Sequence, residues 1–328
     1  MTTLKTLPRR TFLCQTGAAA VAALAGSSAF AGTGGYPIGV QMYAIQSALV
    51  KDFDGTLKAL RKIGYRQVEP TGMLGRTPKQ YRAALDAAGL VAPSAHILSK
   101  EAQAAMLDMA TGKVPPDDAW NKINAAMDLS HLDAIMADMF EQAAVIGNEY
   151  LVLAELDFDL WRTRAGIDRI VSAFTRAGDL CQKQGRKFAW HPHINDYAIV
   201  DGKPGVEWVL AATDPRKVFV ELDFFWATMA RVDIAAFLKR HGPRIRLGHI
   251  KDLAHGAVVP PKGFVDLNSI PTSAFEDVGF GTIDYATLIP LARKTGMRDF
   301  FVERDQAPDP LRTAQRSYDM LSRILDHL

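Results

Sequence analysis

Cysteine is nearly absent from this 328-residue chain, which contains only Cys14 and Cys181. Cys14 falls within an N-terminal segment that has the features of a signal peptide, so a processed protein would retain Cys181 alone. A single cysteine cannot form an intramolecular disulfide and cannot build a thiolate metal site. Any metal site in the processed chain must therefore use imidazole and oxygen ligands.

An excess of charge of either sign is also missing. The chain has 38 basic and 36 acidic residues, a formal net charge of +2. Lys5, Arg9 and Arg10 are the charged residues of positions 1–31, so the remainder carries 35 basic and 36 acidic residues, a charge of −1. Nucleic-acid and anionic-membrane binders usually present a basic surface. We therefore expect no nucleic-acid partner and no stable membrane anchor.

The sequence has no apolar run of the ~20 residues that a membrane-spanning helix needs. Its N-terminus instead has the ordered parts of an export signal: Arg9-Arg10 before Phe12-Leu13, an apolar stretch over 17–25, and Ala29-Phe30-Ala31. Paired arginines before Phe-Leu are typical of a twin-arginine signal. We expect a signal peptide over residues 1–31, cleavage near Ala31, export by the twin-arginine (Tat) machinery, and a periplasmic or secreted location.

Residues 32–328 alternate short apolar runs with longer amphipathic segments. This alternation predicts parallel strands joined by helices, and eight strands favour a closed barrel over an open sheet. The predicted fold class is α/β, a single (β/α)8 TIM barrel in one domain. The predicted strands are 38–43, a strand ending at 69, 91–96, 150–154, 187–191, 218–223, 245–250 and 300–303. The predicted helices include 81–88, 167–184, 234–241, 285–294 and 311–328, and segment 99–146 is expected to place an extra helix over the barrel mouth.

Titratable residues stand at the C-terminal ends of seven predicted strands, where barrel enzymes carry their catalytic groups. The interior of a parallel strand is normally apolar, so polar residues at seven ends indicate one shared site. These residues are Glu69, His96, Glu155, His191 with His193, Asp223, His249 with Lys251, and Glu303.

A set of imidazoles and carboxylates indicates a divalent metal ion. It suits Mn²⁺, Zn²⁺, Fe²⁺ or Co²⁺ better than Mg²⁺ or Ca²⁺, which prefer oxygen ligands. The sequence has no local ligand motif, so the ligands would come from separate strands. His191 and His193 are two residues apart on one predicted strand and should point to the same side.

Taken together, these residues resemble the sugar phosphate isomerase/epimerase family. These xylose isomerase-like barrels also include inosose dehydratases, ketose 3-epimerases and endonuclease IV. The resemblance covers most of residues 38–325 and rests on the order and spacing of eight short motifs. They are Gly39-Val40-Gln41-Met42-Tyr43, Val68-Glu69-Pro70, Ser94-Ala95-His96, Trp190-His191-Pro192-His193, Glu221-Leu222-Asp223-Phe224-Phe225-Trp226, His249-Ile250-Lys251-Asp252, Val278-Gly279-Phe280-Gly281-Thr282-Ile283-Asp284 and Val302-Glu303-Arg304-Asp305.

The resemblance also implies roles for individual residues. The family holds one divalent ion at the ends of strands five to eight, which implies the ligands His191, Asp223, His249 and Glu303 here. The epimerases have a glutamate at the strand-five position, so His191 is a departure from them. The implied acid–base residues are Glu303, His193, Lys251 and Glu155, and the implied substrate contacts are Glu69, His96, Trp226 and Tyr43.

The activity implied is isomerisation or epimerisation of an unphosphorylated keto-sugar through an enediolate. The same intermediate can lose a β-substituent, so an inosose dehydratase-like lyase acting on a keto-sugar or keto-glycoside is the alternative. A non-catalytic exported sugar- or metal-binding protein is a third possibility. The charge of −1 disfavours an endonuclease. A phosphate-specific substrate is also disfavoured, because Gly279-Phe280-Gly281 is more simply a turn before a helix near Asp284 than a phosphate-binding loop.

The export hypothesis gives a first prediction. Replacing Arg9 and Arg10 together by lysine should abolish export, because the receptor reads the arginine pair as an address. Fractionation and immunoblotting should then find the precursor in the cytoplasm. The unchanged chain should instead yield a mature protein whose intact mass is that of a chain beginning after Ala31. Normal export of the double-lysine variant would contradict a twin-arginine signal.

Overall fold

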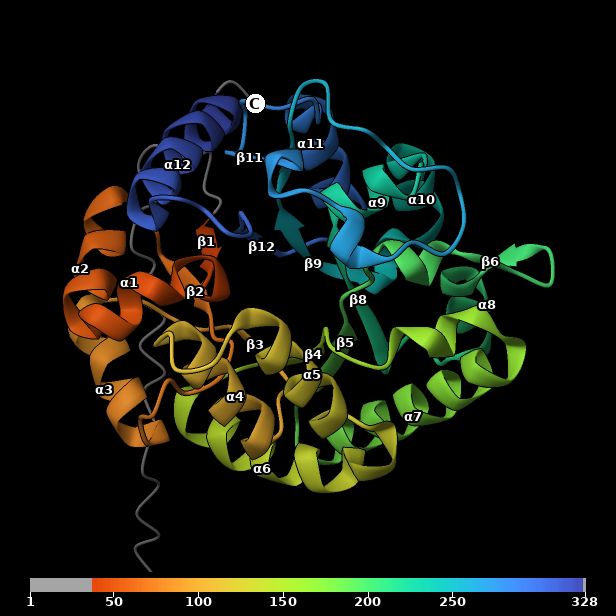
Figure 1. Cartoon of the computed structure of the whole chain (residues 1–328), viewed down its shortest axis with the longest axis horizontal. Coiled ribbons are helices and arrows are strands. Elements are labelled where there is room, and N and C mark those ends of the chain that lie inside the picture. The colour runs from red at the N-terminus through yellow and green to blue at the C-terminus, as the bar shows by residue number, and fades with distance from the viewer. Residues whose placement is uncertain (1–36, 327–328) are drawn as a thin grey trace, which may run out of the picture.

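The computed structural model describes residues 37–326, and the predicted signal peptide and its cleavage site lie outside this range. Eight parallel strands form one sheet in the order β2-β1-β12-β9-β8-β5-β4-β3. Isolated parallel bridges at Gln67–Val91 and Thr71–His96 join the two ends of this order, so the sheet returns on itself. Helices surround the strands (Figure 1). The predicted barrel fold is confirmed.

The eight barrel strands lie where the apolar runs predicted them. Two match the predicted bounds, the second strand ends at Glu69 as predicted, and the other five differ by one to three residues at one or both ends. The strands are β1 (Ile38–Gln41), β2 (Gln67–Glu69), β3 (Ser94–His96), β4 (Tyr150–Leu153), β5 (Lys187–Trp190), β8 (Val218–Asp223), β9 (Ile245–Ile250) and β12 (Asp299–Val302). Two small antiparallel pairs, β6 (Ile199–Val200) with β7 (Lys203–Pro204) and β10 (Asp252–Leu253) with β11 (Phe275–Glu276), were not predicted.

The barrel helices begin and end at residues suited to helix caps. For example, Thr77 and Gln80 form a capping box at the start of α3, and Gly89 ends that helix in the left-handed conformation. The helices around the barrel are α2 (Phe53–Ile63), α3 (Pro78–Ala88), α6 (Leu132–Ile146), α7 (Arg164–Lys183), α8 (Gly205–Ala212), α10 (Ile234–His241), α11 (Tyr285–Thr295) and α12 (Pro310–Asp326). Short helices α1 (Gln46–Lys51) and α9 (Phe224–Met229) follow β1 and β8. The predictions did not include α8 or α9.

Segment 99–146 forms three α-helices and a short 3-10 helix at Leu129–His131. The third, α6, is a barrel helix that packs against α3 and α7, so the extra structure is the pair α4 (Lys100–Ala110) and α5 (Pro116–Ala126). Trp120 of α5 reaches the residues that follow β1, since its ring centroid lies 6.0 Å from that of Tyr43. The expected extra helix is therefore present, as two helices rather than one. Among residues 37–326, no helix is both long enough and apolar enough to span a membrane.

The interior of the barrel is apolar at one level and polar at the next. A buried cluster of inward-facing side chains consists of Tyr150, Val152, Ala189, Phe219, Leu247 and Phe301. Gly39 of β1 makes room for this layer, because a Cβ at that position would lie 2.3 Å from the ring of Phe301. The polar residues stand on the same strands, one step nearer the C-terminal ends.

Candidate metal and catalytic site

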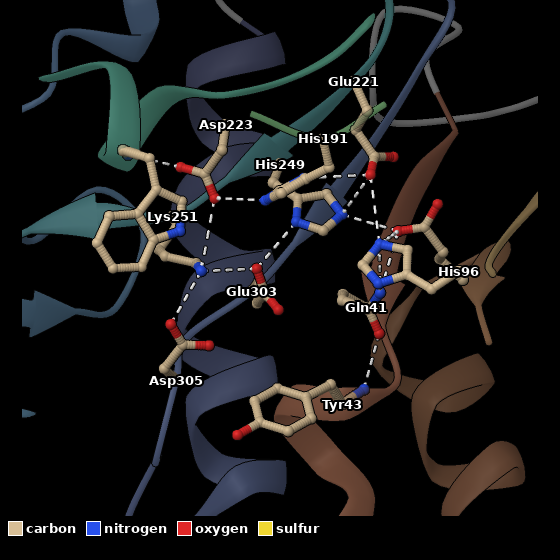
Figure 2. Close-up of polar contacts among 12 residues, drawn as sticks. Gln41, Tyr43, His96, His191, Glu221, Asp223, His249, Lys251, Glu303 and Asp305 are labelled. Carbon is tan, nitrogen blue, oxygen red and sulfur yellow. Dashed lines mark hydrogen bonds and ion pairs between the residues drawn. The ribbon is translucent and has the colours of Figure 1, made fainter. Parts of the chain in front are cut away.

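The polar layer is a consequence of strand geometry. Side chains that face the same side of a strand are two residues apart, so on β9 the apolar Leu247 is followed by His249 and then by Lys251. The same step on the other strands gives Gln41, Glu69, His96, His191, Glu221, Asp223 and Glu303, all of which are buried. Figure 2 shows the labelled side chains of this set converging on one another.

The outer part of this layer surrounds Lys251. Its Nζ lies 2.8 Å from Glu303 Oε2, 3.0 Å from Asp305 Oδ2 and 3.5 Å from Asp223 Oδ2. Burial opposes the charge on Lys251, but the three carboxylates outweigh it and raise the lysine pKa well above its usual value. Glu303 responds in the opposite direction: although burial alone would raise its pKa, Lys251 and His249 hold it well below the usual range. Both groups are therefore charged at neutral pH.

The inner part of the layer is centred on two carboxylates, Glu69 and Glu221. Gln41 Nε2 donates to Glu69 Oε2 at 3.1 Å, and the amide is held by Tyr43 N and Thr71 Oγ1, which both donate to Gln41 Oε1 at 2.7 Å. His96 Nε2 lies 3.3 Å from Glu69 Oε2 and 3.4 Å from Glu221 Oε2. Burial disfavours a charged His96, but Glu69 and Glu221 together outweigh it and raise the imidazole pKa to about 9.

Two histidines lie between the inner and outer carboxylates. His249 Nδ1 is 2.9 Å from Glu303 Oε2, and His249 Nε2 is 2.7 Å from Glu69 Oε2 and 3.2 Å from Glu221 Oε2. His191 Nδ1 is 3.2 Å from Glu221 Oε2, and His191 Nε2 is 3.7 Å from Asp223 Oδ2. Figure 2 shows His249 with Glu303 on one side and Glu221 on the other.

The chemistry of this donor set fits a divalent cation. The cluster contains four carboxylates that are buried completely or almost completely: Glu69, Glu221, Asp223 and Glu303. Among the described residues, Lys251 is the one lysine beside them. Asp223 Oδ2 is buried and accepts no hydrogen bond within the described residues. Two overlapping groups have one ligand atom per residue within 4.8 Å of one another: Asp223, His249 and Glu303, and His96, His191, Glu221 and His249. Lys251 and the histidines His96 and His249, whose pKa values the carboxylates raise, offset part of this buried negative charge. Buried charge that is left uncompensated is costly, and a divalent cation would offset the rest.

Aromatic rings and an imidazole line the rim beside this cluster. The His193 ring lies 4.8 Å from that of His191, 5.3 Å from Phe158 and 5.5 Å from Trp226. The two histidines thus share one side, as predicted from their spacing. Burial and the Lys251 charge lower the pKa of His193 to about 3, so its imidazole is neutral, and its buried Nδ1 has no hydrogen-bond partner among the described residues.

Two further predicted residues, Trp226 and Glu155, lie at the same end of the barrel. Trp226 is held at the start of α9, where its backbone N donates to Asp223 Oδ1 at 2.8 Å, while its buried indole Nε1 has no partner in the described chain. Glu155 follows β4, and burial raises its pKa to about 7, with smaller effects from the charges of His96 and Asp305. A carboxyl group with this pKa exchanges protons readily at neutral pH.

The positions of the predicted residues differ in depth. The four predicted metal ligands come together, but Glu69 and His96, expected at the substrate, lie in the inner layer and contact His249 and Glu221. Sequence reasoning assigned no role to Gln41, Glu221 or Asp305. Each is two residues from a predicted site residue on the same strand or its extension, so the two-residue alternation was the signal that could have identified them.

The loop after β11 does not present free backbone amides to a ligand. The Asp252 carboxylate accepts the N–H groups of Gly279, Gly281 and Ile283 at 2.9–3.1 Å. A side chain of the protein thus occupies the place that a phosphate would take in such a loop. The glycines form a turn before α11, as predicted.

The comparisons with known proteins agree with this architecture. Over 144 residues the chain is 25% identical to an inosose dehydratase of Geobacillus thermodenitrificans, covering 43% of this chain and 48% of that protein, so the match spans about half the length of the curated relative. A sugar phosphate isomerase/epimerase of Parabacteroides distasonis has a similar structure, with a TM-score of 0.64 and 22% identity over 90% of this chain and 96% of that one. The IolI protein, crystallised with a zinc atom, has a TM-score of 0.58 and 16% identity over 88% of this chain and 96% of that one.

The family model for xylose isomerase-like TIM barrels matches residues 57–324, which include seven of the eight barrel strands and the polar residues at their ends. This match covers most of the chain and agrees with the barrel topology. The chain therefore belongs to the family of xylose isomerase-like TIM barrels.

Proposed function

We propose that this protein is an exported, metal-dependent enzyme that isomerises or epimerises an unphosphorylated keto-sugar. The observation that carries the proposal is the buried cluster of histidines and carboxylates beside the unpartnered groups of His193 and Trp226. A non-catalytic binding protein would need the cluster but not a neutral imidazole and a carboxyl group of pKa near 7 beside it.

The proposed ligands are His191, Asp223, His249 and Glu303. Their contacts support this set, since Asp223, His249 and Glu303 form one compact group and His191 Nε2 lies 3.7 Å from Asp223 Oδ2. These four residues would hold a divalent ion, which when bound would polarise a carbonyl group and stabilise negative charge that develops beside it. Zn²⁺, Mn²⁺, Fe²⁺ and Co²⁺ suit this mixed set better than Mg²⁺.

The remaining mouth residues supply proton transfer and orientation. Glu155 is the proposed base for the α-proton, because its pKa near 7 keeps part of it ionised at neutral pH. Lys251 is charged and donates hydrogen bonds toward Glu303 and Asp305, so it is suited to stabilise an oxyanion or to protonate it. His193 and Trp226 each have a buried nitrogen available for a substrate hydroxyl group.

The charges of the mouth favour a neutral substrate. Its one lysine is already surrounded by Asp223, Glu303 and Asp305, and Arg304, on the same strand extension, pairs instead with Glu276 and Asp277. A phosphate group entering this mouth would meet carboxylates rather than free cations, so an unphosphorylated sugar is the better fit.

A lyase is the second candidate, and the partial similarity to inosose dehydratases favours it. Proton loss beside the carbonyl is common to both reactions. In the lyase the enediolate expels a β-substituent, and Lys251 would protonate the leaving group. The residues described above serve either outcome, so the fate of the intermediate must be measured.

The first test concerns the metal. We expect the purified protein to hold one divalent ion at the proposed ligands, and the double variant Asp223→Ala with His249→Ala to lose it, as measured by mass spectrometry of the elements. The unchanged protein should also show a chelator-dependent fall in Tm that the double variant lacks, because a bound ion stabilises only the folded state. Asp299→Asn is the matched control, since this carboxylate lies at the opposite end of the barrel and accepts a hydrogen bond from Gln67. Unchanged metal content in the double variant would refute the ligand set.

The second test identifies the reaction. Metal-loaded enzyme incubated in D₂O with a panel of keto-sugars and keto-glycosides should place deuterium at the carbon next to the carbonyl, as followed by NMR. Exchange with all bonds retained indicates an isomerase or epimerase, and an unsaturated product indicates the lyase. Absence of both exchange and turnover across the panel, with metal bound, would favour the binding protein.

The third test separates proton transfer from metal binding. His193→Ala should keep the ion, because no proposed ligand depends on the His193 imidazole for a hydrogen bond. It should lower kcat/KM by ~10²–10⁴, because the neutral imidazole beside a substrate hydroxyl group can pass a proton to or from it, and this acid–base help would be lost. His131→Ala, which removes an exposed histidine, is the control. Loss of the ion from His193→Ala would make His193 a ligand, and an unchanged kcat/KM would leave proton transfer to Glu155 and Lys251.

A further inference from the structure

Glu221 is a buried carboxylate with three imidazoles around one of its oxygens. Its Oε2 lies 3.2 Å from His191 Nδ1, 3.2 Å from His249 Nε2 and 3.4 Å from His96 Nε2, and the residue is fully buried. Glu221 is part of a motif that carries the family resemblance, but neither the roles which that resemblance implies nor the proposed mechanism gives it a function.

The two histidines that Glu221 shares are both proposed metal ligands, and each has its two ring nitrogens on opposite sides of the polar layer. The inward nitrogens, His191 Nδ1 and His249 Nε2, face Glu221. The outward nitrogens face the other proposed ligands, since His191 Nε2 is directed toward Asp223 and His249 Nδ1 toward Glu303. A ring nitrogen that carries a hydrogen cannot bind a metal ion, so the tautomer decides which side of each ring can act as a ligand.

We propose that Glu221 is a positioning residue that fixes the metal-binding tautomers of His191 and His249. By accepting the inward N–H of each ring, its carboxylate leaves the lone pairs of His191 Nε2 and His249 Nδ1 directed at the outer site. The inference rests on the proposed ligand set and extends it to named ligand atoms.

The backbone at Glu221 is built differently from the rest of its strand. Along β8 and β9, Val220 pairs with Ile245, but the next residue, Glu221, pairs with Leu247, so β9 carries one extra residue at this point. An irregularity of this kind twists the strand and redirects the neighbouring side chains. The irregularity falls at Glu221, whose carboxylate contacts His191 at the end of β5 and His249 on β9. Its position supports a need to place this carboxylate at a defined point between the two rings.

The two histidines depend on Glu221 to different degrees. His249 Nε2 also lies 2.7 Å from Glu69 Oε2, so its tautomer keeps an acceptor when Glu221 is changed. Among the described residues, the hydrogen-bond acceptor recorded for His191 Nδ1 is Glu221. The proposal therefore assigns the larger effect to His191.

The test uses Zn²⁺ as the probe. Glu221→Gln conserves shape but removes the charge, and its amide can present N–H groups to His191 Nδ1, which favours the wrong tautomer. We expect zinc affinity, measured by competition with a chelator, to fall ~10–100-fold, the usual effect of removing such a partner. Asp299→Asn should bind zinc as the unchanged protein does.

A second measurement needs no substitution. In zinc-loaded protein labelled with ¹⁵N-histidine, long-range ¹H–¹⁵N correlation should show hydrogen on His191 Nδ1 and His249 Nε2. Zinc on His191 Nδ1 would overturn the proposal even if Glu221→Gln fails to fold.

The outcomes separate this inference from the proposed function. If the Asp223→Ala, His249→Ala variant loses zinc while Glu221→Gln binds it normally, the ligand set stands and the role of Glu221 is wrong. If the unchanged protein holds two zinc ions and Glu221→Gln holds one, Glu221 is itself a ligand of a separate site, and the proposal is also overturned. If the double variant retains zinc, the ligand set itself fails.

Discussion

The site depends on the balance of charge inside a closed barrel. Glu69, Glu221, Asp223 and Glu303 are removed from water by the strands around them and by the apolar layer beneath them. Ionised groups in such a place must be paired, and removing one partner of a buried pair typically costs ~3–5 kcal/mol. Lys251 and the histidines provide this pairing within the chain, and a divalent cation would complete it. The same pairing brings acidic and basic groups together at one end of the barrel.

Much of this arrangement could be predicted from the sequence, because strand position and depth are linked. The runs at 218–223 and 245–250 match β8 and β9, since these six-residue strands are buried throughout in β8 and at all but Arg246 in β9, and so leave a strong apolar signal. The titratable residues at the strand ends were found for the same reason, since they lie where each strand leaves the apolar core. The choice of four metal ligands among them came from the resemblance to the family and stays a prediction.

Depth was harder to predict than position. Glu69 and His96 end β2 and β3, yet they belong to the inner layer, because their side chains contact Gln41 and Glu221. The two helices α4 and α5 were expected as one, since neither has a strong apolar face. Contacts between strands that are distant in sequence, such as Glu221 with His191, depend on a register that periodicity alone does not contain.

His191 stands where the epimerases that this chain resembles have a glutamate. This difference and the presence of Glu221 have a common physical explanation. A carboxylate ligand at the end of strand five has no N–H group to satisfy, whereas an imidazole has a second nitrogen that must find a partner when buried. His191 therefore requires an acceptor on the inner side of its ring. The neighbouring strand, β8, supplies that acceptor in Glu221, two residues before the proposed ligand Asp223. Strand β8 thus contributes Glu221 to the inner layer and Asp223 to the outer layer. Because Glu221 accepts from His191, the type of ligand at the end of β5 is linked to the sequence of β8.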